Sequence, residues 1–127
     1  MPRDFLNLED ILRIHRDQVE RYGGGLGVRD QGLLESAIAM PQASFGGQHL
    51  HTDLFEMGAA YLYHLTMNHP FIDGNKRVGT VAALLFLELN GITIQATNDE
   101  LFDMVLGVAE GKIPKSAVAE FFRKHSR

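Results

Sequence analysis

The segment between Gly74 and Gly91 constrains the fold of this 127-residue chain more than any other feature. Its interior, residues 81–87, reads Val-Ala-Ala-Leu-Leu-Phe-Leu and is apolar on every face of a helix. A helix that is apolar all round is stable only when other elements cover it on all sides. The segment from Asn75 to Asn90 is therefore predicted to be a buried helix at the centre of the domain, ended by Gly91.

The rest of the chain predicts further helices joined by short connections. Helical spacing of apolar residues, together with start and stop signals, indicates five of them: about 8–22 after an Asn7 cap, 30–40 before Pro41, 54–68 after an Asp53 cap, 98–110 after an Asn98 cap, and one after Pro114. Residues 45–50, around Gly46 and Gly47, are predicted to form a short hairpin or flap. The expected fold is a single, mostly all-α domain over residues 1–127, with about six helices around the buried one.

Composition excludes several classes of function. Twelve Lys and Arg against sixteen Asp and Glu give a net charge of −4, which argues against broad electrostatic binding to nucleic acid or anionic membrane. The absence of cysteine excludes disulfides, thiol catalysis and thiolate metal sites. The longest uncharged apolar stretch, Val78 to Leu87, is far short of the ~20 residues that span a bilayer. With no apolar leader in the first residues, we expect a cytoplasmic protein.

The segment from His69 to Arg77, with the sequence HPFIDGNKR, carries the candidate chemistry. Lys76 and Arg77 lie at the N-terminus of the buried helix, where the helix dipole makes cations unfavourable. A bound anion compensates for this conflict. Gly74 can adopt a positive φ, and the N–H groups of residues 74–77 can then form a concave nest. Nest, helix terminus and two cations together predict a phosphate site.

Asp73 and His69 fit a reaction at such a site. A carboxylate can lie beside a phosphate if Mg²⁺ lies between them. A neutral imidazole at position 69 can take a proton from an attacking hydroxyl. Purely structural roles stay open, because His69 can simply cap its helix and Asp-Gly-Asn is a common turn composition. Lys76 and Arg77 can equally be solvated surface charges.

Other polar residues give weaker signals. His15 and Gln18 share one side of the first predicted helix. Both residues can support the loop, or His15 can simply be a hydrogen-bonded, partly buried histidine. His49 and His51 alternate in the flap and are predicted to face solvent, and the flap is as consistent with an ordinary loop as with strand addition to a target segment. A metal site of His64 with His69 and Asp73 is disfavoured, because the two histidines do not have helical i, i+4 spacing.

The nine-residue segment resembles the signature of the Fic family, His-x-Phe-x-Asp/Glu-Gly-Asn-Gly/Lys-Arg. Lys76 points to its death-on-curing (Doc) branch, the toxins of type II toxin–antitoxin pairs. Further similar segments extend the resemblance over essentially the whole chain: residues 22–24, 27–30, 32–37, 41–42, 53–55 and 87–91. Apart from this resemblance, the glycine-rich run from Gly23 to Gly27 indicates only a joint. The resemblance implies a Fic-like helical bundle.

The resemblance also implies roles for the loop residues. His69 is the expected general base and Asp73 the expected ligand of Mg²⁺. Gly74 and Asn75 are expected to shape the nest, with Asn75 also helping to hold the metal or a phosphate.

The reaction implied by the resemblance depends on Lys76. Lys76 and Arg77 are expected to pair with the phosphates of ATP. Fic proteins that transfer nucleotides have glycine where this chain has Lys76, and a second arginine where it has Thr80. In the Doc branch ATP is taken to bind in the opposite sense, with its γ-phosphoryl group facing the target. The implied reaction is ATP- and Mg²⁺-dependent phosphorylation of a protein hydroxyl, with elongation factor Tu as the family's known target.

Three alternatives stay open: a nucleotidyltransferase on the same fold, a nonenzymatic binding module and a metal-dependent hydrolase. Self-inhibition is not expected, because Ser116 and Glu120 have the spacing of the family's inhibitory motif but Phe121 follows them. A separate antitoxin, with a disordered segment that folds on binding, is therefore implied.

Overall fold

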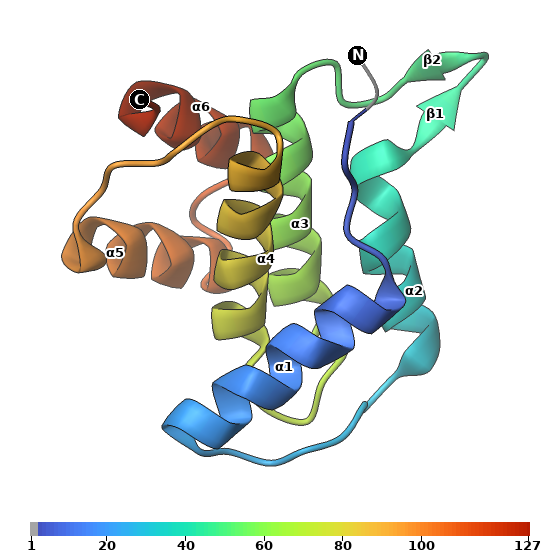
Figure 1. Cartoon of the computed structure of the whole chain (residues 1–127), viewed down its shortest axis with the longest axis vertical. Coiled ribbons are helices and arrows are strands. Elements are labelled where there is room, and N and C mark those ends of the chain that lie inside the picture. The colour runs from blue at the N-terminus through green and yellow to red at the C-terminus, as the bar shows by residue number, and fades with distance from the viewer. Residues whose placement is uncertain (1–2) are drawn as a thin grey trace.

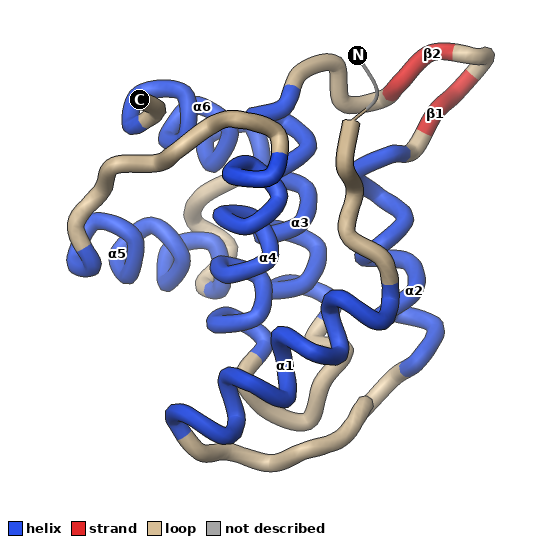
Figure 2. The backbone as a smooth tube through the Cα atoms, in the orientation of Figure 1, coloured by secondary structure: helices blue, strands red, loops and turns tan. Residues whose placement is uncertain are grey.

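The computed structural model describes residues 3–127, which form six α-helices and one small hairpin (Figures 1 and 2). The helices are α1 (Leu8–Tyr22), α2 (Gln31–Ala39), α3 (Leu54–Asn68), α4 (Asn75–Leu89), α5 (Asn98–Ala109) and α6 (Lys115–His125). The hairpin pairs β1 (Ser44–Phe45) with β2 (Gln48–His49) in antiparallel register. The predicted all-α class with a short flap is confirmed. Within residues 3–127, every helix is too short or too polar to cross a membrane.

Helices α3 and α4 lie side by side at the centre and are joined by the loop of residues 69–74 (Figure 1). Glycine allows their close approach, since a Cβ at Gly79 would lie 3.0 Å from the carbonyl oxygen of Leu62. Phe86 and Leu87 of α4 are fully buried, which confirms the predicted buried helix. It shares the centre with α3, which also contacts α2, α5 and α6. α1 packs across one end of α4, next to the loop (Figure 1).

Most helix caps follow the predicted signals. The Asn7 side chain accepts from the N–H of Asp10, and Asp10 accepts in return from the N–H of Asn7. The start of α5 is one correction. Its cap is Thr97 rather than Asn98, because Thr97 and Glu100 form a reciprocal capping box.

The structure also corrects the prediction that His51 faces solvent. His49 is exposed as predicted, but His51 is only 4% exposed. The hairpin ends at His49, so its alternation of faces does not continue to His51, which instead lines a small cleft with residues of α3 and α6. Burial, and then the nearby charge of Lys115, lower the pKa of the His51 imidazole.

Candidate active site

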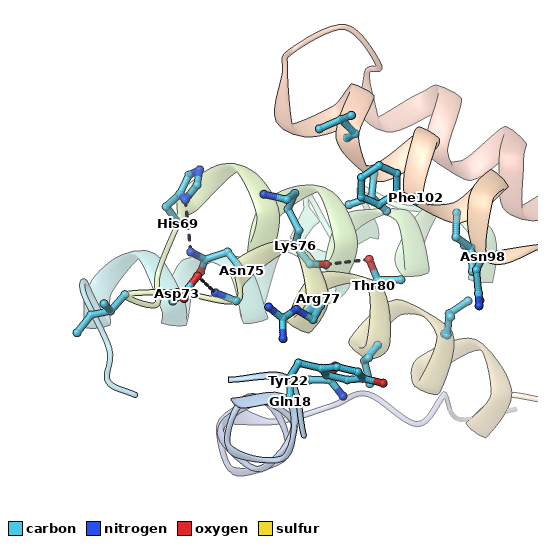
Figure 3. Close-up of a pocket in the computed structure, with 17 residues that line it drawn as sticks. Gln18, Tyr22, His69, Asp73, Asn75, Lys76, Arg77, Thr80, Asn98 and Phe102 are labelled. Carbon is cyan, nitrogen blue, oxygen red and sulfur yellow. Dashed lines mark hydrogen bonds between the residues drawn. The ribbon is translucent and has the colours of Figure 1, made fainter. Parts of the chain in front are cut away.

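The loop of residues 69–74 and the start of α4 line a cleft of about 690 Å³ (Figure 3). The other walls come from α1 and α5. The cleft brings together every residue that the sequence predicts for the site: His69, Asp73, Gly74, Asn75, Lys76 and Arg77.

His69 ends α3 in the left-handed conformation, with φ of 47°. It is the sole non-glycine residue with a positive φ in residues 3–127, and this conformation costs about 1–2 kcal/mol. Its side chain is exposed at the cleft, and the ring nitrogen that does not face Asn75 points away from it (Figure 3). His69 therefore caps its helix, as a purely structural role requires, and still presents an imidazole to the cleft.

The buried Asn75 side chain braces the loop. Its oxygen accepts from the N–H of Phe71 at 2.9 Å, and its amide nitrogen donates to the carbonyl of Phe71 at 3.0 Å. The first bond fixes which end of the amide is oxygen, because an N–H requires an acceptor. The same amide nitrogen lies 3.3 Å from Nδ1 of His69. Phe71 is 1% exposed and anchors the loop in the core.

The N-terminus of α4 is open to an anion. Gly74 is its N-cap, with φ of 82° and no side chain to bond the first turn. Within the described chain, the N–H groups of residues 75–77 have no hydrogen-bond partner, and the side chains of Lys76 and Arg77 are exposed beside them. The N–H of Gly74 is bonded to Oδ1 of Asp73 at 2.8 Å. The nest therefore offers three free N–H groups, one fewer than predicted.

The carboxylate of Asp73 lies against the glycine-rich segment. A Cβ built on Gly24 would lie 2.7 Å from Oδ2 of Asp73. Asp73 is exposed and forms no ion pair with a residue in 3–127. One carboxylate with a free oxygen fits Mg²⁺, provided that a substrate's phosphates and water complete the shell. Residues 3–127 contain no group of three or more His, Cys, Asp or Glu placed to hold a metal, so His64 does not extend the site.

Helix α1 supports the loop through His15, which contacts Asp73 and Phe71. His15 is 4% exposed, its Nε2 lies 2.9 Å from the carbonyl oxygen of Asp73, and its ring stacks on Phe71 with centroids 3.9 Å apart. Since a carbonyl only accepts, Nε2 of His15 donates. His15 is thus both a satisfied buried histidine and a support of the loop. Gln18, one turn later, is buried and lines the cleft.

Tyr22, which sequence reasoning did not assign to the site, lies under the guanidinium of Arg77, with 5.3 Å between the guanidinium carbon and the ring centroid (Figure 3). This is cation–π distance. Two sequence signals point to it: its place one turn after Gln18 on the same face of the helix, and the family resemblance of residues 22–24.

The segment of residues 23–30, of which Gly23 to Gly27 were predicted to be only a joint, packs along the loop; we call it the strap. The N–H of Ile72 donates to the carbonyl of Gly27, and Val28 forms a bridge with Phe71. Arg29 of the strap bonds the end of α3 through its side chain and the loop carbonyl of Pro70 through its main-chain N–H. Gly24 and Arg29 are therefore parts of the site's support that sequence reasoning missed.

Comparison with known proteins agrees with this geometry. The family model described as Fic/DOC family matches residues 5–87, which include the whole loop. This chain belongs to the Fic/DOC family. The Fic/DOC protein "Protein kinase doc" of Escherichia phage P1 is 39% identical to it over 116 residues, 91% of this chain and 90% of the relative. "Toxin Doc" of Mycolicibacterium smegmatis is 41% identical over 96 residues, 76% of this chain and 72% of the relative.

One wall of the cleft in this Fic/DOC protein lies beyond the matched residues. It consists of one face of α5, with the apolar residues Leu101, Phe102, Val105 and Leu106. Phe102 is 62% exposed and Leu106 36%. The polar loop on one side of the cleft thus faces a partly uncovered apolar helix on the other.

Proposed function

We propose that this protein is the toxin of a toxin–antitoxin pair, and that it transfers the γ-phosphoryl group of ATP to a hydroxyl of a target protein in the presence of Mg²⁺. The observation that carries the proposal is the joining, in one cleft, of an exposed imidazole, a free carboxylate and an uncapped helix N-terminus with two cations. The names of the two relatives, a protein kinase and a toxin, support the same class of activity.

The start of α4 holds the triphosphate in this proposal. The free N–H groups of residues 75–77 and the side chains of Lys76 and Arg77 are the donors. Tyr22 limits the positions of the Arg77 guanidinium. Asp73, with help from Asn75, is the proposed side of the Mg²⁺ site. When bound, Mg²⁺ neutralises phosphate charge that builds up during transfer.

His69 is the proposed general base. The oxygen of the target hydroxyl forms a bond to the γ-phosphorus, the bond from that phosphorus to the β,γ-bridging oxygen breaks, and ADP leaves. The hydroxyl proton passes to His69. For Nε2 to take it, the neutral ring must carry its own proton on Nδ1, so the amide nitrogen of Asn75 has to move away from Nδ1. Their separation of 3.3 Å is longer than a typical hydrogen bond, so this costs little.

Elongation factor Tu is the proposed target, which places the reaction in the cytoplasm. The test is to incubate the protein with elongation factor Tu, Mg²⁺ and ATP labelled on either the α- or the γ-phosphate. Transfer of the γ-label alone supports phosphorylation. Transfer of the α-label would replace the proposal with nucleotide transfer on the same fold. Absence of both labels from elongation factor Tu and from every protein of a translation extract would contradict an enzyme of this kind.

We also propose that the antitoxin's disordered segment folds as a helix over the apolar face of α5, beside the loop, and blocks ATP or the target. The exposure of Phe102 and Leu106 at the cleft supports this site. Substituting both by Asp should weaken the complex with the antitoxin by about 100-fold or more, since a central apolar contact is lost. An unchanged dissociation constant would place the antitoxin elsewhere.

A further inference from the structure

Arg29 binds three consecutive carbonyl groups, two at the end of α3 and one at the start of the loop. Its Nε donates to the carbonyl of His69 at 2.7 Å, and its Nη2 donates to the carbonyl of Asn68 at 3.0 Å. Its main-chain N–H donates to the carbonyl of Pro70 at 2.7 Å. The last carbonyls of a helix lack partners within the helix and carry partial negative charge, so a guanidinium is well suited to this position.

The strap holds Arg29 in register with the loop. The N–H of Asp30 also donates to the carbonyl of Pro70, at 3.1 Å, and the N–H of Ile72 donates to the carbonyl of Gly27, at 3.1 Å. The main chain on either side of Arg29 is therefore fixed to the loop. The Arg29 side chain therefore reaches the end of α3 from a main chain that is itself hydrogen-bonded to the loop.

The turn that Arg29 binds is the strained one. A left-handed non-glycine residue persists only where its surroundings hold it, and His69 is the sole such residue in residues 3–127. Asn75 holds the ring side of His69 through Nδ1. Arg29 holds the main-chain side through the carbonyl oxygen. Loss of the guanidinium would leave the ring contact in place but release the turn.

We infer that Arg29 is a positioning residue, which keeps the main chain of His69 in its left-handed turn and so aims the imidazole into the cleft. Arg29 does not line the cleft, so it acts through His69 rather than by touching a nucleotide. The inference deepens the proposed function and rests on the proposed role of His69 as general base.

The test compares Arg29→Ala and Arg29→Lys with Arg13→Ala, a control at an exposed arginine of α1 outside the cleft. Arg29→Ala should lower kcat for γ-phosphoryl transfer by about 10- to 100-fold, because small misplacement of a reacting group has effects of this size. KM for ATP should stay within about twofold, since Arg29 does not line the cleft. Arg29→Lys should recover part of kcat, because an ammonium can donate to the same carbonyls without the fork geometry. Arg13→Ala should match the parent.

Nuclear magnetic resonance tests the turn without any activity. The three-bond coupling between the amide and α protons of His69 reports φ, and should change in Arg29→Ala but not in Arg13→Ala. An unchanged coupling would overturn the inference, as would a parental kcat in Arg29→Ala or a large rise in KM with kcat unchanged. If the parent protein transfers no phosphoryl group, the proposed function fails, yet the coupling still decides whether Arg29 holds His69. If Arg29→Ala does not fold, Arg29→Lys provides the same comparison.

Discussion

Nδ1 of His69 faces the amide nitrogen of Asn75 across 3.3 Å. That nitrogen only donates, and its orientation is set by the bond from the N–H of Phe71 to the Asn75 oxygen. Nδ1 of the neutral imidazole therefore accepts, and the ring proton lies on Nε2. The protein without substrate thus keeps its proposed base in the tautomer that cannot yet accept a proton at Nε2.

This relationship gives the first prediction. In ¹⁵N-detected spectra of the protein without nucleotide, neutral His69 should be mainly the Nε2–H tautomer. Asn75→Ala removes the donor to Nδ1 and should raise the fraction of the Nδ1–H tautomer. His15 serves as the internal control, because its Nε2 donates to the carbonyl of Asp73 and its tautomer should not change. A parent spectrum dominated by Nδ1–H of His69 would contradict the assignment.

The second prediction concerns His69 itself. His69→Ala should reduce transfer by about 10²–10⁴-fold, the usual contribution of a general base. The melting temperature should change little, because the side chain is exposed and the Arg29 bonds to the turn use main-chain carbonyls. ATP affinity, measured by calorimetry, should stay close to the parent's. Modification of the target at the parental rate would show that His69 is not the base.

Lys76 is the subject of the third prediction. A lysine adds bulk and a point charge to the nest, and it should favour the pose that presents the γ-phosphorus. Lys76→Gly should lower γ-label transfer by about 10²-fold, by loss of charge stabilisation of the transferring group. Thr80 offers a matched control. Its hydroxyl donates to the carbonyl of Lys76 within the helix, so Thr80→Ser should keep γ-label transfer.

The γ-label and the α-label in Lys76→Gly test two different roles of Lys76. Undiminished γ-label transfer in Lys76→Gly would remove Lys76 from the mechanism and leave the fold untouched. Weak transfer of the α-label by the variant would show that position 76 selects the pose of ATP.

The fourth prediction is a pH dependence of stability. Burial, then the charge of Lys115 and the neighbouring His51, lower the pKa of His64 to about 4 from 6.5. Between these values the unfolded chain binds more protons than the folded one, so stability rises with pH across the window and is lost as pH falls toward 4. The ring is partly exposed, so we expect a loss on the order of 1 kcal/mol.

His64→Gln should reduce that pH dependence, because glutamine can still accept from Lys115 but does not titrate. The remaining part comes from His51, whose pKa is also lowered by burial. His49→Gln, at an exposed histidine of the hairpin, should keep it. Chemical denaturation at a series of pH values measures both. An equal slope in the parent and in His64→Gln would show that His64 does not produce the dependence.

The loop could be predicted from the sequence because its chemistry is contiguous. His69 to Arg77 occupy nine successive positions, and the unfavourable cations at the start of α4 are visible without any tertiary contact. The buried helix was equally visible, since a helix that is apolar on all sides has to be covered on all sides.

The support of the loop was left open for His15 and was not indicated for Arg29, because it comes from distant parts of the chain. Arg29 and His69 are 40 positions apart, and His15 and Asp73 are 58 apart. Such contacts depend on how α1 and the strap pack, which local patterns do not encode. The prediction that His51 faces solvent was wrong for a related reason. Alternation in a hairpin predicts a face only while the strand continues, and β2 ends two residues earlier.

The last prediction uses two neighbouring glycines of the strap. Gly23 and Gly24 both have positive φ, at 83° and 113°, so alanine is strained at either position. Their surroundings differ. A Cβ at Gly23 meets nothing within 4 Å, whereas one at Gly24 would lie 2.7 Å from Oδ2 of Asp73. Both substitutions should cost about 1–3 kcal/mol of stability through backbone strain. Only Gly24→Ala should displace the carboxylate.

The Mg²⁺ concentration needed for half-maximal transfer should therefore rise by about tenfold in Gly24→Ala and stay at the parental value in Gly23→Ala, because a carboxylate ligand is lost from a site that has few. Equal Mg²⁺ dependence in the two variants would separate Asp73 from the metal and leave it as a bond acceptor for the N–H of Gly74.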